Sequence, residues 1–360
     1  MTNKGENRNT RRGSTVQDSS LFPNSLRGAG WLLSIIFLVG LLLLSLFVGS
    51  VKIPVSDVWA ILMGDEAERL SWRFIVMETR LPAALTAVLC GSALAVCGLL
   101  LQTAFRNPLA GPGVFGISNG AALGVALVML LSPVSASLVS LRWQGYLAVL
   151  AAAFVGALAV TALLMLFSLF VRNNVMLLVV GIMVGYISSS AISLLNFAAT
   201  EEGVRSYMMW GLGSFQGVSM QTLPIFALLT FVGLFASTML LKPLNALLLG
   251  ERYAESLGIQ TRRVRLWLLL VTGLLCAVTT AFCGPIAFLG LAVPHMARLL
   301  LGSENHRLLL PATMLMGAVV ALVCHLASLQ LGSHGSVPIN AITPLVGAPV
   351  IIYVVMRRKL

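Results

Sequence analysis

The stretch LPAALTAVLCGSALAVCGLLLQ, residues 81–102, contains no charged residue, and its only polar side chains are Thr86, Ser92 and Gln102. About 20 consecutive apolar residues let an α-helix cross the ~30 Å hydrocarbon core of a bilayer. A spanning β-strand would instead alternate apolar and polar residues with a period of two, which this stretch does not do. The segment therefore predicts a transmembrane helix and sets the kind of fold to expect elsewhere in the chain.

Similar blocks recur along the whole sequence. The chain is 58% hydrophobic and only 10% charged, a composition that the exterior of a soluble domain would not tolerate. We predict an all-α, polytopic membrane protein with about ten transmembrane helices, counted as blocks of span length. The predicted spans are 31–49, 81–102, 113–131, 146–170, 175–198, 222–241, 266–283, 286–301, 308–328 and 339–356.

The N-terminal segment and the basic residues predict the orientation. Residues 1–30 are polar and basic without a periodic apolar face, so we expect a disordered cytoplasmic tail before a transmembrane domain at 31–360. The block at 31–49 is long for a signal peptide and lacks a small-x-small cleavage site, which favours a retained span. With the N-terminus inside, most of the 23 Lys and Arg residues fall in cytoplasmic segments, as the positive-inside rule requires. Both termini are therefore expected in the cytoplasm, and no nucleic-acid partner is needed to explain the net charge.

The sequence shows no pattern typical of catalysis or of metal and cofactor binding. The five cysteines fall within or at the ends of predicted spans, where small residues at helix contacts are favoured over disulfides or metal ligands. No GK[ST] phosphate loop and no HExxH motif occurs. His295 and His325 are interpreted as packed or water-facing residues. No Asp or Glu lies in a predicted span, whereas a carrier coupled to ions usually holds such a group near the midplane.

Glycine and proline interrupt the apolar pattern in RNPLAGPGVFGISNG (106–120), CGPIAFLGLAVPHMARLLLG (283–302) and PINAITPLVGAPV (338–350). Broken backbone is tolerated at membrane depth only where it is buried in protein or lines a wet cavity, and interrupted helices are typical of transport pathways. Close helix packing is the alternative for any single glycine. The first two breaks are expected on opposite sides of the membrane, which suggests an inverted repeat over 80–200 and 265–356. The expected pathway and break residues are Asn107, Pro108, Gly113, Gly116, Ser118, Asn119, Gly120, Gly284, Pro285 and Pro294.

The stretch LGERYAESLGIQTRR, residues 249–263, is unusual because charges crowd between two apolar blocks. Gly250 and Gly258 tolerate special backbone angles and are expected to bracket a short helix. Within that helix Tyr253 and Leu257 stand at i and i+4, beside Ala254, and form an apolar face too small to fold alone. Either this helix docks on a partner surface, or it is a solvated linker.

Three motifs resemble one family, the FecCD-type permeases that import vitamin B12, iron-siderophores and haem by ATP-driven (ABC) transport. They are RLPAALTAVLCGSALAVCGLLLQTAFRNPLAGPGVFGISNGAALG (80–124), GPIAFLGLAVPHMARLLLGSENHRLLLP (284–311) and PINAITPLVGAPVIIYVV (338–355). The resemblance runs from about Arg80 to Val355, and VRSYMMWGLGSFQGVS (204–219) is similar to the family's outer loop and short helix after the fifth span.

The resemblance implies a homodimeric permease in the bacterial inner membrane, with two cytoplasmic ATP-binding subunits and a periplasmic or lipid-anchored substrate-binding protein. GERYAESLG matches the family's coupling loop, expected here over about 242–265. Its coupling residues would be Gly250, Glu251, Ala254, Leu257 and Gly258, with Ala254 and Leu257 facing the ATP-binding subunit.

The outer surface departs from the family pattern. Family members often read Arg-Leu-Pro-Arg where this chain has Ala83 after Arg80, and the family's acid and arginine near the end of the ninth span are missing from CHLASLQLGSHGS (324–336). Docking of the binding protein is therefore expected to use Arg80 and Arg205, with His334 as a candidate.

Three hypotheses follow. The leading one is the permease subunit of an ATP-driven importer for an iron chelate, haem or cobalamin, without an ATPase site of its own. A secondary carrier coupled to ions is disfavoured by the absence of acids in the spans, and a membrane-embedded enzyme is disfavoured by the scattered histidines.

Overall fold

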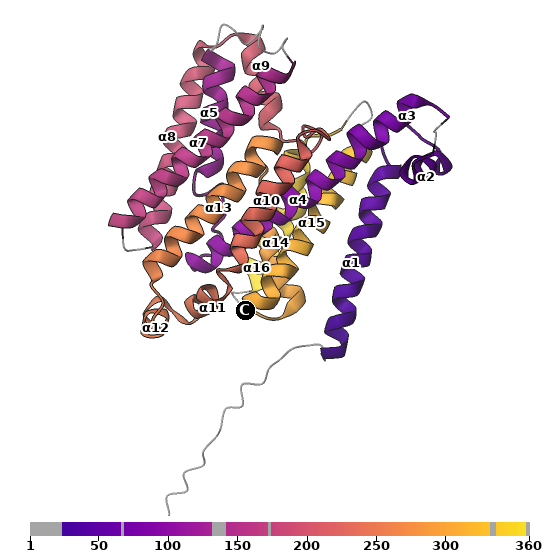
Figure 1. The fold of residues 1–360 in the computed structure, drawn as a ribbon. Helices are drawn as coiled ribbons and strands as arrows, with labels where there is room; N and C mark the ends of the chain where they lie inside the picture. Colours follow the sequence, from indigo (N-terminus) through magenta and orange to yellow (C-terminus); the bar gives the residue numbers. More distant parts are fainter. Residues whose placement is uncertain (1–23, 66–67, 132–141, 172–173, 332–335, 358–360) are drawn as a thin grey trace, which may run out of the picture.

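The computed structural model describes residues 24–65, 68–131, 142–171, 174–331 and 336–357, and among these residues it contains helices and no strand (Figure 1). The expected all-α class is confirmed. The helices are α1 (Asn24–Phe47), α2 (Val55–Met63), α3 (Leu70–Phe74), the π-helix η1 (Ile75–Arg80), α4 (Leu81–Ala104), α5 (Ile117–Leu131), α7 (Arg142–Phe170), α8 (Asn174–Ala198), α9 (Glu201–Gly211), α10 (Leu223–Thr238), α11 (Leu241–Leu249), α12 (Glu251–Ser256), α13 (Thr261–Cys283), α14 (Leu289–Leu301), α15 (His306–Leu331) and α16 (Ile339–Arg357).

In the described part of the chain, six helices are long and apolar enough to cross a membrane. Helices α10 and α11 make a seventh if this pair, bent by 48°, is one span. The shorter apolar helices α5, α14 and α16 lie at the other three predicted span positions. The chain is therefore a multi-pass membrane protein.

The first helix starts before the predicted span at 31–49, although its apolar window starts at Gly30. Helix α1 begins at Asn24, whereas the sequence suggested a tail to residue 30. The polar residues of this first turn hid the start of the helix from a hydropathy argument. Residues 1–23, where disorder was expected, lie outside the described residues, as does His334.

Helix α4 lies at the centre of the molecule and packs on α13, α14 and α15. Its glycines allow this close approach, because a Cβ added at Gly98 would collide with the carbonyl group of Gly290 on α14. A Cβ added at Gly91 would likewise collide with the carbonyl group of Gly317 on α15. Small residues at helix contacts let membrane helices gain packing and hydrogen-bond energy that lipid cannot supply.

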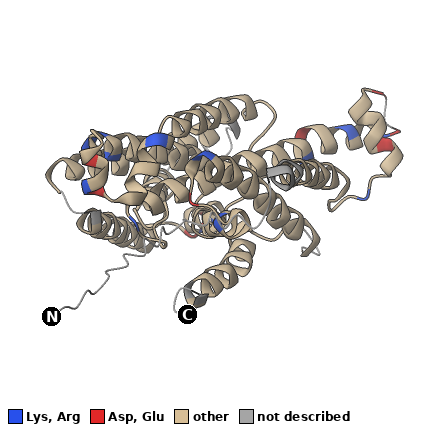
Figure 2. Ribbon diagram, turned by 90° about the horizontal axis from the view of Figure 1, so that it is seen from below, with Lys and Arg blue, Asp and Glu red and all other residues tan. Residues whose placement is uncertain are grey.

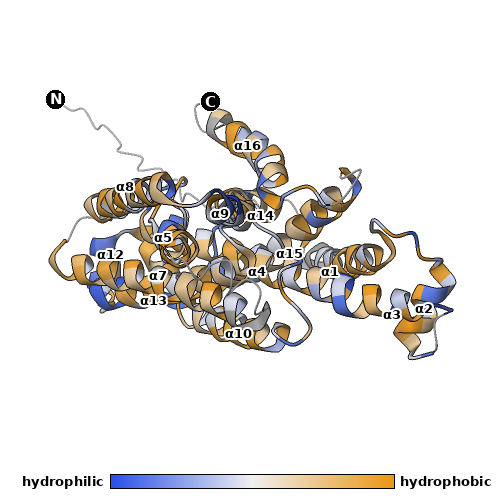
Figure 3. Cartoon of the chain, turned by 90° about the horizontal axis from the view of Figure 1, so that it is seen from above, coloured by the Kyte–Doolittle hydropathy of each residue, from blue (hydrophilic) through white to orange (hydrophobic). Residues whose placement is uncertain are grey.

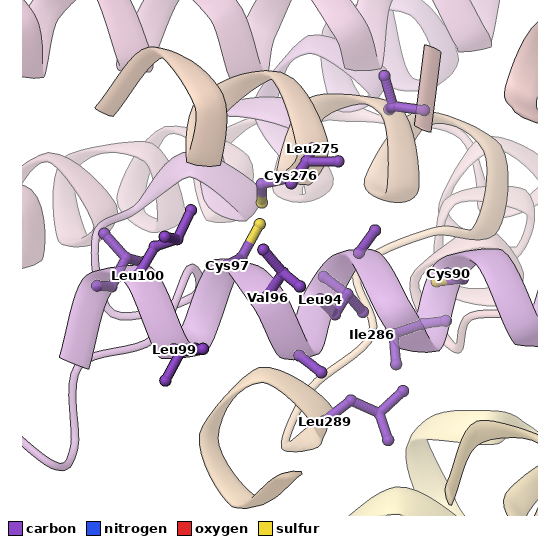
Figure 4. Packing of buried hydrophobic residues seen from close by; sticks show 14 of the residues in the cluster. Cys90, Leu94, Val96, Cys97, Leu99, Leu100, Leu275, Cys276, Ile286 and Leu289 are labelled. Atoms are coloured by element: carbon purple, nitrogen blue, oxygen red, sulfur yellow. The ribbon is translucent and has the colours of Figure 1, made fainter. Parts of the chain in front are cut away.

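The cysteines belong to this packing. In Figure 4 the sulfur atoms of Cys97 on α4 and Cys276 on α13 point toward each other. The Cys97 thiol also donates to the carbonyl oxygen of Thr272 at 3.5 Å. All five cysteines are buried and free, and the positions of Cys97 and Cys276 agree with the interpretation as helix-contact residues.

The bundle has two ends, named here after the short helices that mark them (Figure 1). The α12 end carries α11, α12 and the C-terminal turn of α4. The α9 end carries α9, the last turn of α13 and the start of α16. Helix α13 has 23 residues, and at 1.5 Å per residue it covers about 35 Å between the two ends.

Helices α2 and α3 were not expected. They lie beyond α1 at the edge of the molecule, on the α9 end (Figures 1 and 3). A separate small core supports them: Leu46, Ile53, Val58, Ile61 and Val76. Their apolar residues are too few and too interrupted to stand out in a search for spans.

Candidate functional site

The charged segment at the α12 end folds as the two glycines suggested. Gly250 has a φ of 124° and Gly258 a φ of 81°, and the residues between them form α12. Both angles lie in a region that residues with a Cβ rarely adopt. Seen from the α12 end, charged residues gather around α12 and the start of α13, while much of the remaining ribbon is uncharged (Figure 2).

Ionic and polar contacts fix α12 to the rest of the chain. The Arg265 guanidinium on α13 contacts the Glu251 carboxylate at 3.3 Å and donates to the Val171 carbonyl oxygen at 3.1 Å. Arg106, just after α4, donates to the carbonyl oxygen of Leu247 at 3.0 Å, at the end of α11. A displacement of α12 would therefore pull on α4, α11 and α13 together.

The surface that α12 presents differs from the expectation. Ala254 is fully buried, so it packs inward and cannot face a partner. Leu249, Tyr253 and Leu257 are each at least half exposed. We name these three residues the coupling patch. The spacing of Tyr253 and Leu257 was read correctly, but Leu249 was missed because it precedes the turn at Gly250.

A polar relay connects α11 to the core at this end. The side-chain oxygen of Asn245 accepts from the backbone N–H of His306 at 2.8 Å and lies 2.9 Å from His306 Nδ1. Because a backbone N–H only donates, the contacting atom of Asn245 must be its oxygen, and Nδ1 must carry the imidazole proton. His306 Nε2 then accepts from the Thr103 hydroxyl at 2.8 Å. Asn245, His306 and Thr103 thus join α11, α15 and α4.

A second chain of contacts runs beside the first. Arg298 on α14 donates to the side-chain oxygen of Gln102 at 2.6 Å and contacts Glu304 at 3.2 Å. The amide of Gln102 donates to the Leu291 carbonyl oxygen at 3.1 Å. These residues lie within the quoted family motifs, but the motifs do not show which of them pair, since Gln102 is distant in sequence from Arg298 and Leu291.

The residues of the first predicted break lie near the α12 end and along α5. Asn107 closes a turn by accepting from the N–H of Leu109 at 2.9 Å, and the Pro108 carbonyl oxygen accepts from His295 at 2.8 Å. Asn119 donates to the Gly185 carbonyl oxygen on α8 at 3.2 Å. Ser118 lies 3.4 Å from the sulfur of Cys276 on α13.

The glycines of this break differ among themselves. Gly116 is buried with a φ of 73°, and Gly120 is buried against Gly156 and Val160 of α7. Gly113 is exposed, and an added Cβ there would have no neighbour within 4 Å. Gly116 and Gly120 therefore take part in close packing within one chain, and their role in a pathway stays a prediction.

We expect Gly120→Ala to reduce the amount of folded protein, because its Cβ would lie 2.6 Å from the Gly156 carbonyl oxygen. Overpacking of this kind typically costs ~1–3 kcal/mol. Gly113→Ala is the matched control and should leave abundance unchanged. Membrane abundance and detergent melting temperature measure both; equal behaviour of the two variants would contradict the packing role.

The second break lies at the α9 end. Helix α13 ends at Cys283, and α14 begins at Leu289 after Gly284 (φ 76°) and Pro285. Asn340, at the start of α16, donates to the carbonyl oxygens of Gly211 at 3.1 Å and Pro285 at 2.6 Å. The two Gly-Pro breaks thus lie at opposite ends of the bundle, as expected, while the inverted repeat itself stays a prediction.

Pro294 lies buried inside α14. Its predicted role as a break residue was therefore wrong, because α14 continues through it. The interruption lies at Gly284 and Pro285, within the predicted stretch 283–302, and the predicted span at 286–301 started before the helix does. Phe288 has a φ of 67°, a conformation that an ordinary residue seldom adopts and that sequence pattern cannot foresee.

A concavity of about 940 Å³ opens at the α9 end, between α8 and α9. Exposed Arg205 lines it together with Asn196 and Glu201. The side-chain oxygen of Asn196 is buried, with no hydrogen-bond partner among the described residues. A polar group of this kind costs free energy in the absence of a partner, which makes the concavity a candidate contact site for a ligand or protein.

Arg80 does not have the exposure expected of a docking residue. It is only 6% exposed, and its guanidinium donates to the carbonyl oxygens of Leu46 (2.7 Å), Phe47 (3.1 Å) and Val51 (2.5 Å). The last carbonyl groups of a helix lack partners within the helix, and a cation there is stabilised by the helix dipole. Arg80 therefore caps α1, and the prediction of an exposed outer charge was wrong.

We expect Arg80→Ala to lower the free energy of unfolding by roughly 1–3 kcal/mol, because three carbonyl oxygens, one of them in a buried bond, lose their donor. Arg73→Ala, at an exposed position on α3, should change it by less than about 0.5 kcal/mol. Thermal unfolding in detergent compares the two variants, and equal melting temperatures would refute the capping role.

Among the described residues, no group of three or more His, Cys, Asp or Glu side chains lies close enough together to hold a metal ion. The candidate site consists of the coupling patch, the relay behind it and the concavity at the opposite end of the bundle.

Comparisons with known proteins include the coupling patch, the relay and the concavity. A family model described as the FecCD transport family matches residues 36–357. The hemin transport system permease protein HmuU of Yersinia pestis is 32% identical over 326 residues, covering 90% of this chain and 94% of that protein. The vitamin B12 import system permease protein BtuC of Vibrio cholerae serotype O1 is 37% identical over 341 residues, covering 91% of this chain and 95% of that protein.

Among solved structures, a metal-chelate type ABC transporter in an inward-facing conformation has a TM-score of 0.78 and 29% sequence identity. It covers 94% of this chain and 100% of its own. The likeness thus includes both ends of the bundle.

Proposed function

The chain belongs to the FecCD transport family, and from this we propose that it is the transmembrane permease subunit of an ATP-driven importer in the bacterial inner membrane. Its cargo is a metal chelate or a tetrapyrrole of the kind that the relatives carry, either an iron-siderophore, haem or cobalamin. The chain supplies the pathway, and separate subunits hydrolyse ATP.

The coupling patch is the observation that carries this proposal. Leu249, Tyr253 and Leu257 leave an apolar surface open to water on a segment that arginine contacts hold in place. Exposed apolar surface beside polar residues is typical of a protein-binding site. An ATP-binding subunit that seats on the patch would move α11 and α12, and the relay would pass this motion to α4 and α15.

The proposed orientation follows from that assignment. The α12 end faces the cytoplasm, with both termini on the same side, and the α9 end faces the periplasm. Gly250, Glu251, Leu257 and Gly258 act in coupling, whereas Ala254 supports the helix from behind. The concavity lined by Arg205 faces the substrate-binding protein, and a second copy of the chain completes the pathway.

Purification in mild detergent tests the assignment. A tagged chain, expressed in its native host, should co-purify with an ATP-binding protein and a substrate-binding protein. The absorption spectrum of the ligand released by the latter distinguishes haem, cobalamin and an iron-siderophore. Uptake into proteoliposomes that requires internal ATP supports the proposal, while uptake driven by an ion gradient in the absence of ATP would favour a secondary carrier.

A further inference from the structure

Helices α2 and α3, which we call the peripheral helix pair, expose apolar side chains that nothing in the described chain covers. On α2, Val55, Trp59 and Met63 are 60%, 43% and 73% exposed, and they stand at i, i+4 and i+8. On α3, Leu70 and Phe74 are 87% and 64% exposed, at i and i+4. Each helix therefore shows a continuous apolar stripe on its outside.

The peripheral helix pair is also rigidly held. The opposite side of α2 buries Val58 and Ile61 in the small core below it. Arg80 ties η1 to the last turn of α1 through its three carbonyl contacts. The stripes are therefore a fixed surface whose exposure does not come from a loose segment.

The position of α1 locates this surface relative to a bilayer. The apolar window Gly30–Phe47 has 18 residues, of which only 11% are buried in the protein. At 1.5 Å per residue it covers about 27 Å, close to the ~30 Å hydrocarbon core. Because α1 is apolar, long enough to span and little covered by the rest of the described chain, we expect it to face lipid and the chain after Phe47 to emerge at the boundary between hydrocarbon and headgroups.

The apolar stripe of α2 continues directly from the end of that span. The rings of Phe47 and Trp59 lie 6.0 Å apart. Arg69 lies over the ring of Trp72 at 5.2 Å. Tryptophan is enriched at the membrane boundary, and arginine there reaches the headgroups while its stem stays in apolar surroundings.

We propose that the peripheral helix pair lies in the membrane surface, with Val55, Trp59, Met63, Leu70 and Phe74 inserted among phospholipid acyl chains. Helices of this kind bury one apolar face about 5–10 Å into the boundary region. The pair then anchors the outer end of α1, the span with little protein contact, and holds the start of α4 at a set depth. This inference depends on the chain crossing the membrane and is independent of its cargo.

Site-directed spin labelling of the full-length chain in nanodiscs of phosphatidylethanolamine and phosphatidylglycerol tests the proposal. Single cysteines are introduced as Met63→Cys and Phe74→Cys, and Ser71→Cys is the matched control, because Ser71 is exposed on the same helix as Phe74. The five native cysteines are buried, so the nitroxide reagent should react with the introduced thiol. Leu70→Cys replaces any variant that fails to fold.

Dissolved oxygen concentrates in lipid, while a nickel chelate stays in water. We expect the ratio of oxygen to nickel accessibility to exceed one at positions 63 and 74 and to fall below one at position 71. Ratios below one at all positions would place the pair in water and overturn the proposal. Protection from both reagents at positions 63 and 74 would overturn it as well, since it would indicate a protein contact such as a second copy of the chain.

Discussion

Leu257→Asp is expected to abolish uptake while the protein remains folded in the membrane. Leu257 is 58% exposed in the coupling patch, so a carboxylate there meets water in the free chain and costs little. In the assembled importer the same carboxylate would be buried against the ATP-binding subunit without a partner. If Leu257 is one of the few residues that dominate the interface, its loss costs ~2 kcal/mol or more, which is roughly a thirtyfold weaker association.

Two substitutions on the neighbouring helix α12 make this test specific. Ser256→Asp places the same charge on an exposed position outside the coupling patch and should leave transport near the wild-type level. Ala254→Arg should instead reduce protein abundance, because position 254 has no exposed surface. Co-purification with the ATP-binding subunit, uptake and membrane abundance are measured for each variant. Normal uptake by Leu257→Asp at normal abundance would remove the coupling patch from the mechanism.

The sequence predicted the middle of the spans well, because nearly every position there must be apolar whether it faces lipid or another helix. Residues 81–102 read as a span because almost every position in α4 must be apolar, whichever neighbour it faces. The ends of spans were less predictable. Local contacts decide them, such as the extension of α4 backward through η1 or the delayed start of α14 at Leu289.

The site residues that could be predicted are likewise those whose role depends on local properties. Gly250 and Gly258 were predictable because their positive φ angles are a local property that glycine signals directly. Ala254 was misplaced because a helix of six residues does not reveal by itself which side faces the protein. Arg80 was misplaced because its partners lie more than 25 residues earlier, at the end of α1 and just after it. A positive charge beside a span looks the same in sequence whether it caps a helix or binds a partner.

The relay of Asn245, His306 and Thr103 could not be predicted from the sequence either, because its contacts join residues that are distant in the chain. Asn245 and His306 are 61 residues apart in the chain, and although His306 lies in the family motif at 284–311, nothing in that motif indicates Asn245 as its partner. Only the packing of α11 against α15 brings them together. A polar side chain between apolar blocks could have drawn attention to Asn245, but nothing local named its partner.

Asn245→Ala is expected to separate ATP hydrolysis from uptake. The substitution removes the acceptor for two donors of His306 and the donor to Asn305, which lies 3.0 Å away. Helix α12 and the coupling patch remain, so the ATP-binding subunit should still bind. Motion of α11 would then reach the end of α4 through Arg106 and through apolar contacts, while the polar connection to α15 through His306 would be lost. Since each unsatisfied buried group costs about 1–3 kcal/mol, we expect transport to fall by roughly tenfold or more.

Asn245→Asp is the conservative comparison, because its carboxylate keeps an acceptor for both donors of His306 while the bond to Asn305 is lost. We expect it to restore most of the uptake that Asn245→Ala loses. Uptake per ATP hydrolysed, measured in proteoliposomes of the assembled importer, distinguishes coupling from stability, since a merely unfolded fraction lowers hydrolysis and uptake in proportion. An unchanged ratio in Asn245→Ala would mean that the relay only stabilises the α12 end, and coupling would then rest on the arginine contacts of α12 alone.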